Sequence, residues 1–253
     1  MMAAVGLVVM KGTPVENLLI GFDGLIQGRL LARYKRFFAD IELDTGEIIT
    51  AHCPNPGKML GLLEPGTPAL VTWLDDPTKK LSYRLEALME RGTWVGVNTQ
   101  WPNRVIALAI RDGLIPEVAG YGHIQPEKKY GHNSRIDLYA SGHAALPDAY
   151  IEIKNVHLSR RPGHAEFPDC VTERGAKHLY ELIEMVKAGY RAVVIFCIQR
   201  NDCSDFAIAR DCDPGFGRAY DAACAAGVEF IAVACAFAPR GLSYDRALRF
   251  AAE

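Results

Sequence analysis

Two short runs decide the fold: Ser-Arg-Ile-Asp-Leu-Tyr at residues 134–139, and Tyr-Ile-Glu-Ile-Lys at residues 150–154. Side chains of a strand alternate between its two faces, so Glu152 and Lys154 share one face and the isoleucines share the other. If the two runs pair as a hairpin, Asp137 lies beside Glu152. The sequence therefore predicts a sheet with two carboxylates and an ammonium group on one face.

This combination of side chains suits the hydrolysis of a phosphodiester. Carboxylates can hold a divalent cation that activates water, and magnesium needs only one or two of them because it keeps several waters. We therefore expect Asp137 and Glu152 to bind Mg²⁺ or Mn²⁺ and Lys154 to orient the attacking water. The three side chains match the arrangement of the PD-(D/E)xK nuclease fold. The other interpretation is an ordinary strand whose Glu-x-Lys pair forms a surface salt bridge.

A further acid, Glu127, precedes this set in the run Pro-Glu-Lys-Lys-Tyr-Gly. It is either a third metal-binding acid or a loop acid that Lys128 neutralises, and the sequence leaves both interpretations open. Arg135 lies in the first decisive run, two residues before Asp137, and is a candidate contact for a nucleic-acid phosphate.

The clearest helix is expected between residues 172 and 188, where apolar side chains recur at helical spacing and Gly189 follows. Three basic residues lie near its beginning: Arg174, Lys177 and His178. Free backbone amides and the helix dipole favour a phosphate at this end. The alternative is a solvated helix start, capped by Asp169 or Thr172.

The remaining pattern predicts two domains after an N-terminal extension. Five short alternating strands separated by turns occupy residues 23–91, which favours a small β-barrel with the OB-fold as the leading candidate and an SH3-like barrel as the alternative. Residues 92–253 alternate helices and strands, which indicates an α/β sandwich. Residues 1–22 are interpreted as the extension.

A second basic cluster lies in the predicted barrel and contains aromatic residues. It comprises Arg33, Tyr34, Lys35 and Arg36, followed by Phe37 and Phe38. Basic and aromatic side chains together suit contact with a nucleic-acid backbone and stacking of its bases. The alternative is that Phe37 belongs to the core and the charges are merely solvated.

Composition limits the partners and the compartment. The formal net charge of the 253 residues is −2, so any nucleic-acid contact must use local patches. The seven cysteines contain no CxxC pair, and their odd number without a secretory signal fits a reducing cytoplasm. The apolar stretch at residues 3–10 is too short to span a membrane, so no membrane partner is expected.

Several segments together resemble the sugar fermentation stimulation protein A (SfsA) family. The resemblance implies an N-terminal OB-fold, a C-terminal PD-(D/E)xK domain, DNA binding and a cytoplasmic setting in bacteria or archaea. It also places Asp137, Glu152 and Lys154 in the nuclease signature, with Glu127 as a candidate further acid. The matching segments are Arg33–Phe37, His52–Asn55, Val97–Thr99, Lys129–Gly131, Ser134–Asp137, Glu152–Val156, Phe167–Asp169, Thr172–Gly175 and Lys177–Leu179.

The sequence departs from the family pattern in small ways. His157 stands where a threonine is usual, and Cys170 stands where an alanine is usual. Neither change removes an expected metal ligand.

The leading functional hypothesis is a largely sequence-nonspecific DNA-binding protein with a divalent-metal-dependent nuclease site. One alternative is a DNA-binding regulator of sugar metabolism without catalysis, and another is an RNA-binding or RNA-processing protein, because OB-folds accept either nucleic acid. Single-stranded DNA is a candidate partner, and the sequence leaves a homo-oligomer open.

Overall fold

The N-terminal part forms a closed β-barrel in the computed structural model, which describes residues 18–131 and 134–251. Its strands are β2 (Ile26–Tyr34), β3 (Phe38–Leu43), β4 (Ile48–His52), β5 (Pro68–Trp73), β6 (Tyr83–Glu90) and β7 (Thr93–Gly96). They follow the order β4-β3-β2-β5-β6-β7, and a further pairing of β4 with β6 closes the barrel. Alternate side chains, such as Ala39, Ile41 and Leu43, fill its core as the period-two pattern predicts.

The barrel ends later in the chain than the sequence suggests. β7 pairs with β6, so the barrel sheet runs to Gly96 and beyond the boundary expected after residue 91. Leu18–Gly21, within the expected extension, forms β1 and pairs with the C-terminal strand β16 (Gly241–Phe250). The rest of that extension, residues 1–17, lies outside the described residues.

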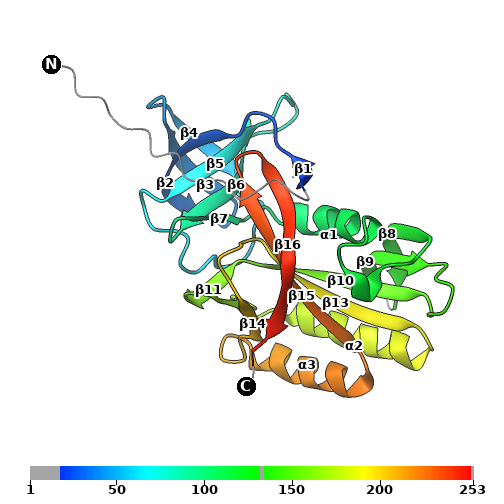
Figure 1. Cartoon of the computed structure of the whole chain (residues 1–253). Helices are drawn as coiled ribbons and strands as arrows, with labels where there is room; N and C mark the ends of the chain where they lie inside the picture. Colours follow the sequence, from blue (N-terminus) through cyan, green and yellow to red (C-terminus); the bar gives the residue numbers. More distant parts are fainter. Residues whose placement is uncertain (1–17, 132–133, 252–253) are drawn as a thin grey trace.

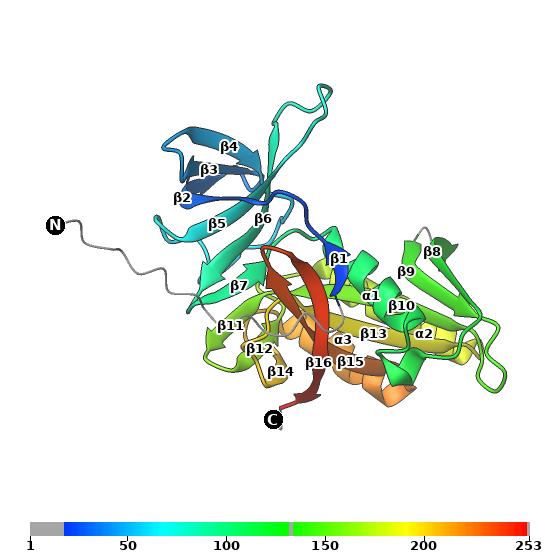
Figure 2. The ribbon, with the colours of Figure 1, turned by 45° about the horizontal axis from the view of Figure 1, so that its top comes forward.

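The second domain is built on one large mixed sheet (Figures 1 and 2). Its order is β11-β12-β14-β16-β15-β13-β10-β9-β8, with β1 beside β16. β9 and β10 form the predicted antiparallel hairpin, and β10, β13 and β15 run parallel. The strands not yet given are β8 (His123–Tyr130), β9 (Ser134–Ser141), β10 (Ala149–Val156), β11 (Leu158–Arg161), β12 (His164–Phe167), β13 (Arg191–Ile198), β14 (Asp205–Ile208) and β15 (Glu229–Ala238).

Helices cover both faces of this sheet. They are α1 (Trp101–Arg111), α2 (Glu173–Lys187) and α3 (Pro214–Ala226), and a 3₁₀ turn lies at Pro116–Val118. The apolar side of α1 packs into a core on one face, and α2 and α3 share a second core on the other. Because β13 lies between the two cores, its side chains from residue 192 to 198 are all buried. The α2 helix begins where Thr172 Oγ1 accepts a hydrogen bond from the Gly175 amide, so Thr172 is its N-cap.

A buried carboxylate joins the barrel to the second domain. Glu86 on β6 is fully buried and accepts hydrogen bonds from Trp101 Nε1 at 2.7 Å and Asn98 Nδ2 at 2.8 Å. Its other oxygen accepts from Arg84 Nε at 2.6 Å and from the Thr72 hydroxyl at 2.9 Å. Four donors thus compensate the desolvation of this charge and fix the first turn of α1 against the barrel.

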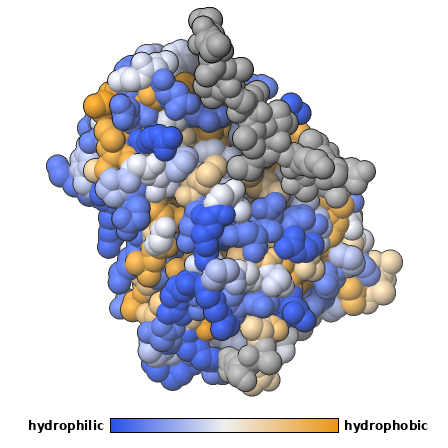
Figure 3. Space-filling model, turned by 60° about the vertical axis from the view of Figure 1, so that its left-hand side comes forward, coloured by the Kyte–Doolittle hydropathy of each residue, from blue (hydrophilic) through white to orange (hydrophobic). Residues whose placement is uncertain are grey.

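The surface mixes polar and apolar side chains. On the face in Figure 3, hydrophilic residues separate small apolar patches over both domains. Among the described residues, no helix is long and apolar enough to cross a membrane.

Candidate metal centre and nucleic-acid interface

Asp137 occupies the point at which β9 and β10 separate. The strand pairing runs from Ala149–Ala140 to Ile151–Leu138 and goes no further. At the next position Asp137 Oδ2 accepts a hydrogen bond from the Ile153 amide at 2.8 Å, in place of a strand carbonyl. Asp137 Oδ1 accepts a second hydrogen bond from Asn103 Nδ2 of α1, also at 2.8 Å. Two elements therefore hold the Asp137 carboxylate next to the β10 residues.

Glu152 is the buried carboxylate of the site. Its Oε1 accepts a hydrogen bond from Lys154 Nζ at 2.8 Å and also contacts His178 Nδ1 on α2. Its Oε2 is buried and has no hydrogen-bond partner among the described residues. A buried oxygen without a partner is costly, so this atom is suited to a bound cation or water.

The two carboxylates differ in their ionisation. Burial and the neighbouring charge of Glu152 raise the pKa of Asp137 to about 6. Burial also opposes ionisation of Glu152, but Lys154 and His178 outweigh it and lower the pKa of Glu152. In the absence of a cation, Asp137 is therefore the member of the pair that takes up a proton first.

These residues line a pocket of about 280 Å³ between α1, the β9–β10 hairpin and the start of α2. Arg135 and Arg174 also line it, so two arginine side chains contribute to the walls of the pocket. Within residues 18–131 and 134–251, no three or more His, Cys, Asp or Glu side chains gather to hold a metal. A cation here would thus have two carboxylates and complete its shell with water, as Mg²⁺ commonly does.

The expected third acid lies outside this pocket. Glu127 on β8 is exposed and pairs with Arg135 Nη1 at 3.2 Å, and it is not among the lining residues. The structure therefore places Glu127 next to a pocket residue, rather than next to the carboxylate pair.

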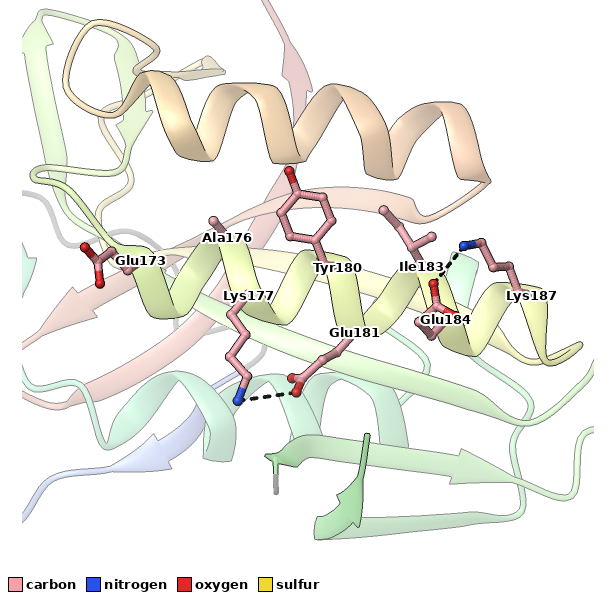
Figure 4. Close-up of a pocket in the computed structure, with 8 residues that line it drawn as sticks. All are labelled: Glu173, Ala176, Lys177, Tyr180, Glu181, Ile183, Glu184 and Lys187. Carbon is pink, nitrogen blue, oxygen red and sulfur yellow. Dashed lines mark hydrogen bonds and ion pairs between the residues drawn. The ribbon is translucent and has the colours of Figure 1, made fainter. Parts of the chain in front are cut away.

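Two of the three basic residues of α2 face the pocket, and the third faces away from it. Arg174 and His178 line the pocket, and Arg174 Nε lies 3.4 Å from His178 Nε2. Lys177 instead pairs with Glu181 at 3.5 Å and lines a separate shallow depression along α2, which also contains Tyr180 (Figure 4). His178 is buried and contacts Glu152, so it supports the carboxylate and is closed off from solvent.

The basic cluster of the barrel surrounds the β2–β3 turn. Lys35 and Arg36 adopt positive φ angles of 47° and 65° there, and both side chains are exposed. The Arg33 guanidinium donates to the carbonyl oxygens of Arg36, Asn55 and Gly57, at 2.7 to 3.1 Å. Arg33 therefore braces the turn against the loop after β4, and Tyr34 stacks on Phe38 with ring centroids 5.5 Å apart.

Asn103 is a site residue that none of the sequence motifs above contains. Its position is nevertheless a signal, because it shares a helix face with the buried Ile106 and Ile110, three and seven residues later. A polar residue on an apolar helix face needs a polar partner, and here that partner is Asp137.

Comparisons with known proteins agree with this architecture. The protein-family model described as "SfsA N-terminal OB domain" matches residues 31–97, and the family model described as "Sugar fermentation stimulation protein RE domain" matches residues 100–241. The chain belongs to the SfsA family. A sugar fermentation stimulation protein homolog of Caulobacter vibrioides is 48% identical over 211 residues, covering 83% of this chain and 88% of the relative. The Brucella ovis homolog is 51% identical over 218 residues, covering 86% and 91%.

A solved structure has the same fold. The Pyrococcus furiosus SfsA, described in complex with Ca²⁺, superposes with a TM-score of 0.83 and 25% identity. The match covers 93% of this chain and 99% of that one. The predicted OB barrel followed by an α/β domain is therefore confirmed, and the pairing of these two domains supports nucleic-acid binding at the level of the SfsA family.

Proposed function

We propose that this SfsA family member is a largely sequence-nonspecific DNA-binding protein that cleaves phosphodiester bonds with one divalent cation held by Asp137 and Glu152. The observation that carries the proposal is the buried, unpartnered Oε2 of Glu152 beside the Asp137 carboxylate. Mg²⁺ or Mn²⁺ is the proposed ion. The Ca²⁺ in the Pyrococcus furiosus relative supports a divalent cation, because Ca²⁺ and Mg²⁺ both take oxygen ligands.

The chain's own residues then have distinct tasks. Asn103 and the Ile153 amide orient Asp137, and His178 holds Glu152. A bound cation would lower the pKa of a water and neutralise charge on the phosphate. Lys154 Nζ, which donates a hydrogen bond to Glu152 in the same pocket, would orient that water and stabilise the developing charge.

Phosphate binding is assigned to the two arginines of the pocket. Arg135 and Arg174 can each donate paired hydrogen bonds to phosphate oxygens, which position a strand without reading its bases. The exposed Lys35 and Arg36 would add contacts at the barrel. This distribution explains why binding is expected to tolerate many sequences and to weaken steeply with salt.

The proposal is tested by incubating the protein with single- and double-stranded DNA and RNA, in the presence of Mg²⁺ or Mn²⁺. Cleavage should be lost in Asp137→Ala and Lys154→Ala, and it should persist in Glu127→Ala because that acid lies outside the pocket. Arg174→Ala should weaken cleavage more than Lys177→Ala, its neighbour on the same helix. If the protein cuts nothing while it and both pocket variants bind DNA equally, the nuclease proposal is wrong and a non-catalytic binder is indicated.

A further inference from the structure

We propose that the outer face of the barrel holds single-stranded DNA through a row of stacked rings and passes it over Thr99 into the metal pocket. This inference rests on the proposed function, because it names the strand that the pocket would cut. It adds Phe37, His52 and Arg84 to the interface and predicts where the strand enters.

The row crosses the barrel from strand to strand. Its members are Tyr34, Phe38, His52 and Arg84, each of which pairs with the next across β2, β3, β4 and β6. The residues that alternate with them, such as Ala39 and Ala51, are buried in the barrel, so the row lies on the outer face.

Two ring pairs make this face a stacking platform. Tyr34 stacks on Phe38 at 5.5 Å, and Phe37 stacks on His52 with ring centroids 6.3 Å apart. Phe37 is 43% exposed and Tyr34 is 39% exposed, although both are large aromatic side chains. Exposed rings beside a basic turn are the arrangement with which proteins hold unpaired bases.

Two connections lead from this row to the pocket. Pro54, only two residues beyond His52 and hence within about 7 Å of it, accepts a hydrogen bond from Thr99 Oγ1 at 2.6 Å. Thr99 itself lines the metal pocket. At the end of the row, Arg84 Nη1 lies 3.4 Å from Gln100 Oε1, and its guanidinium lies 5.7 Å from the Trp101 ring centroid. Both connections reach the segment that begins α1, whose Asn103 contacts Asp137.

Charge along the route favours a polyanion. Lys35 and Arg36 are exposed at one end of the row, and Arg84 is partly exposed at the other. The same face of β3 carries two acids: Asp40 accepts hydrogen bonds from Tyr34 and Thr50, and the exposed Glu42 lies opposite Arg29 of β2. Glu86 is fully buried. Because Arg84 is paired with Glu86, the positive charge open to a polyanion lies mainly at the Lys35–Arg36 end of the row.

A single strand fits this route better than a duplex does. Aromatic platforms act on the faces of bases, and in a duplex those faces are already stacked on neighbouring base pairs. We therefore expect the strand to lie with bases on the Phe37 and Tyr34 rings and its backbone towards the basic side chains.

The test measures binding in EDTA, so its result does not depend on cleavage. The probe is a fluorescein-labelled thymidine oligomer of about 12 nucleotides, within the usual site size of an OB-fold. Phe37→Ala should weaken binding about 5- to 140-fold, because one stacked base is lost. Phe37→Tyr should bind as the parent protein does, and Tyr180→Ala should too, since that exposed ring lies on α2 of the second domain and not on the barrel.

The same assay with a blunt duplex and with an RNA oligomer decides the class of ligand. The single DNA strand should bind more tightly than the duplex and at least as tightly as RNA. The inference is overturned if Phe37→Ala binds the single strand normally, if the blunt duplex binds more tightly, or if RNA is preferred and loses affinity in Phe37→Ala. Absence of cleavage with intact, Phe37-dependent binding would instead refute the nuclease proposal alone.

Discussion

Replacing Asp137 by asparagine should stabilise the metal-free protein, although it removes an expected metal ligand. The substitution keeps the shape of the side chain and removes one charge from a buried pair. An asparagine carbonyl can still accept from the Ile153 amide, and Asn103 can turn its own amide over to accept from the new NH₂ group.

The magnitude follows from the pKa of Asp137. That pKa is raised from 3.8 to about 6, and each pKa unit corresponds to ~1.4 kcal/mol. Because the folded-state pKa is raised, the ionised carboxylate destabilises the folded protein above pH 6, by up to about 3 kcal/mol. This penalty disappears as the pH falls below the ordinary aspartate value. We therefore expect Asp137→Asn to gain about 1–3 kcal/mol at pH 7.5 and to match the parent near pH 4.

Urea unfolding at both pH values, with EDTA or with Ca²⁺, provides the measurement. Ca²⁺ at about 100 times its dissociation constant should stabilise the parent protein by ~2.7 kcal/mol and the variant far less. The matched control is Glu127→Gln, an exposed acid whose loss should change stability by less than about 0.5 kcal/mol. A variant that is less stable than the parent in EDTA at pH 7.5, or that Ca²⁺ stabilises equally, would refute the reasoning.

Three further predictions concern the supports of the site. In urea unfolding, Glu86→Gln should lower the free energy of unfolding by about 3 kcal/mol, because it breaks a buried ion pair with Arg84. In addition, the NH₂ group of the glutamine would face hydrogen-bond donors that now point at a carboxylate oxygen. Asp169→Asn should cost about 1–3 kcal/mol at neutral pH. Burial opposes ionisation of Asp169, but the contacts with His157 and the Met59 amide outweigh it and lower its pKa. The ionised Asp169 stabilises the folded protein above the pKa that it has in the unfolded chain, and this stabilisation is lost in acid. The difference in unfolding free energy between Asp169→Asn and the parent should therefore shrink below about pH 4, and a difference that stays constant would contradict this explanation. Calorimetric titration should show Mn²⁺ affinity falling about tenfold per pH unit below pH 6, as the proton on Asp137 competes; a flat profile would exclude that competition.

Much of the architecture follows from local patterns in the sequence. Strand alternation predicts the barrel, and the apolar run at residues 191–198 predicts the central strand β13 with the bounds that it has. The helix expected from residue 172 begins one residue later, because Thr172 is its cap. These features depend on neighbours in the chain, so periodicity and capping rules are sufficient to find them.

Other features depend on partners that are distant in the sequence. Nothing local shows that Leu18–Gly21 pairs with residues 241–243, or that Glu86 meets Trp101 across a domain boundary. The placement of the basic residues on α2 is similar. Arg174 and Lys177 look equivalent as charges, yet only the angular position on the helix decides that Arg174 faces the pocket and Lys177 faces Glu181.

The pairing of β1 with β16 makes the barrel an insertion within the second domain. The described part of the chain lies in the large sheet at Leu18–Gly21, then builds the barrel and returns to the second domain at Trp101 (Figure 1). A domain that is connected to its neighbour by two chain segments has less freedom to reorient than a domain joined by one linker. The span from the barrel surface to the proposed metal site is therefore fixed by two chain connections, and the proposed function gives this span a measurable consequence. A strand whose end is anchored on the barrel would be cut at a fixed number of nucleotides from that end, and the products would share one length.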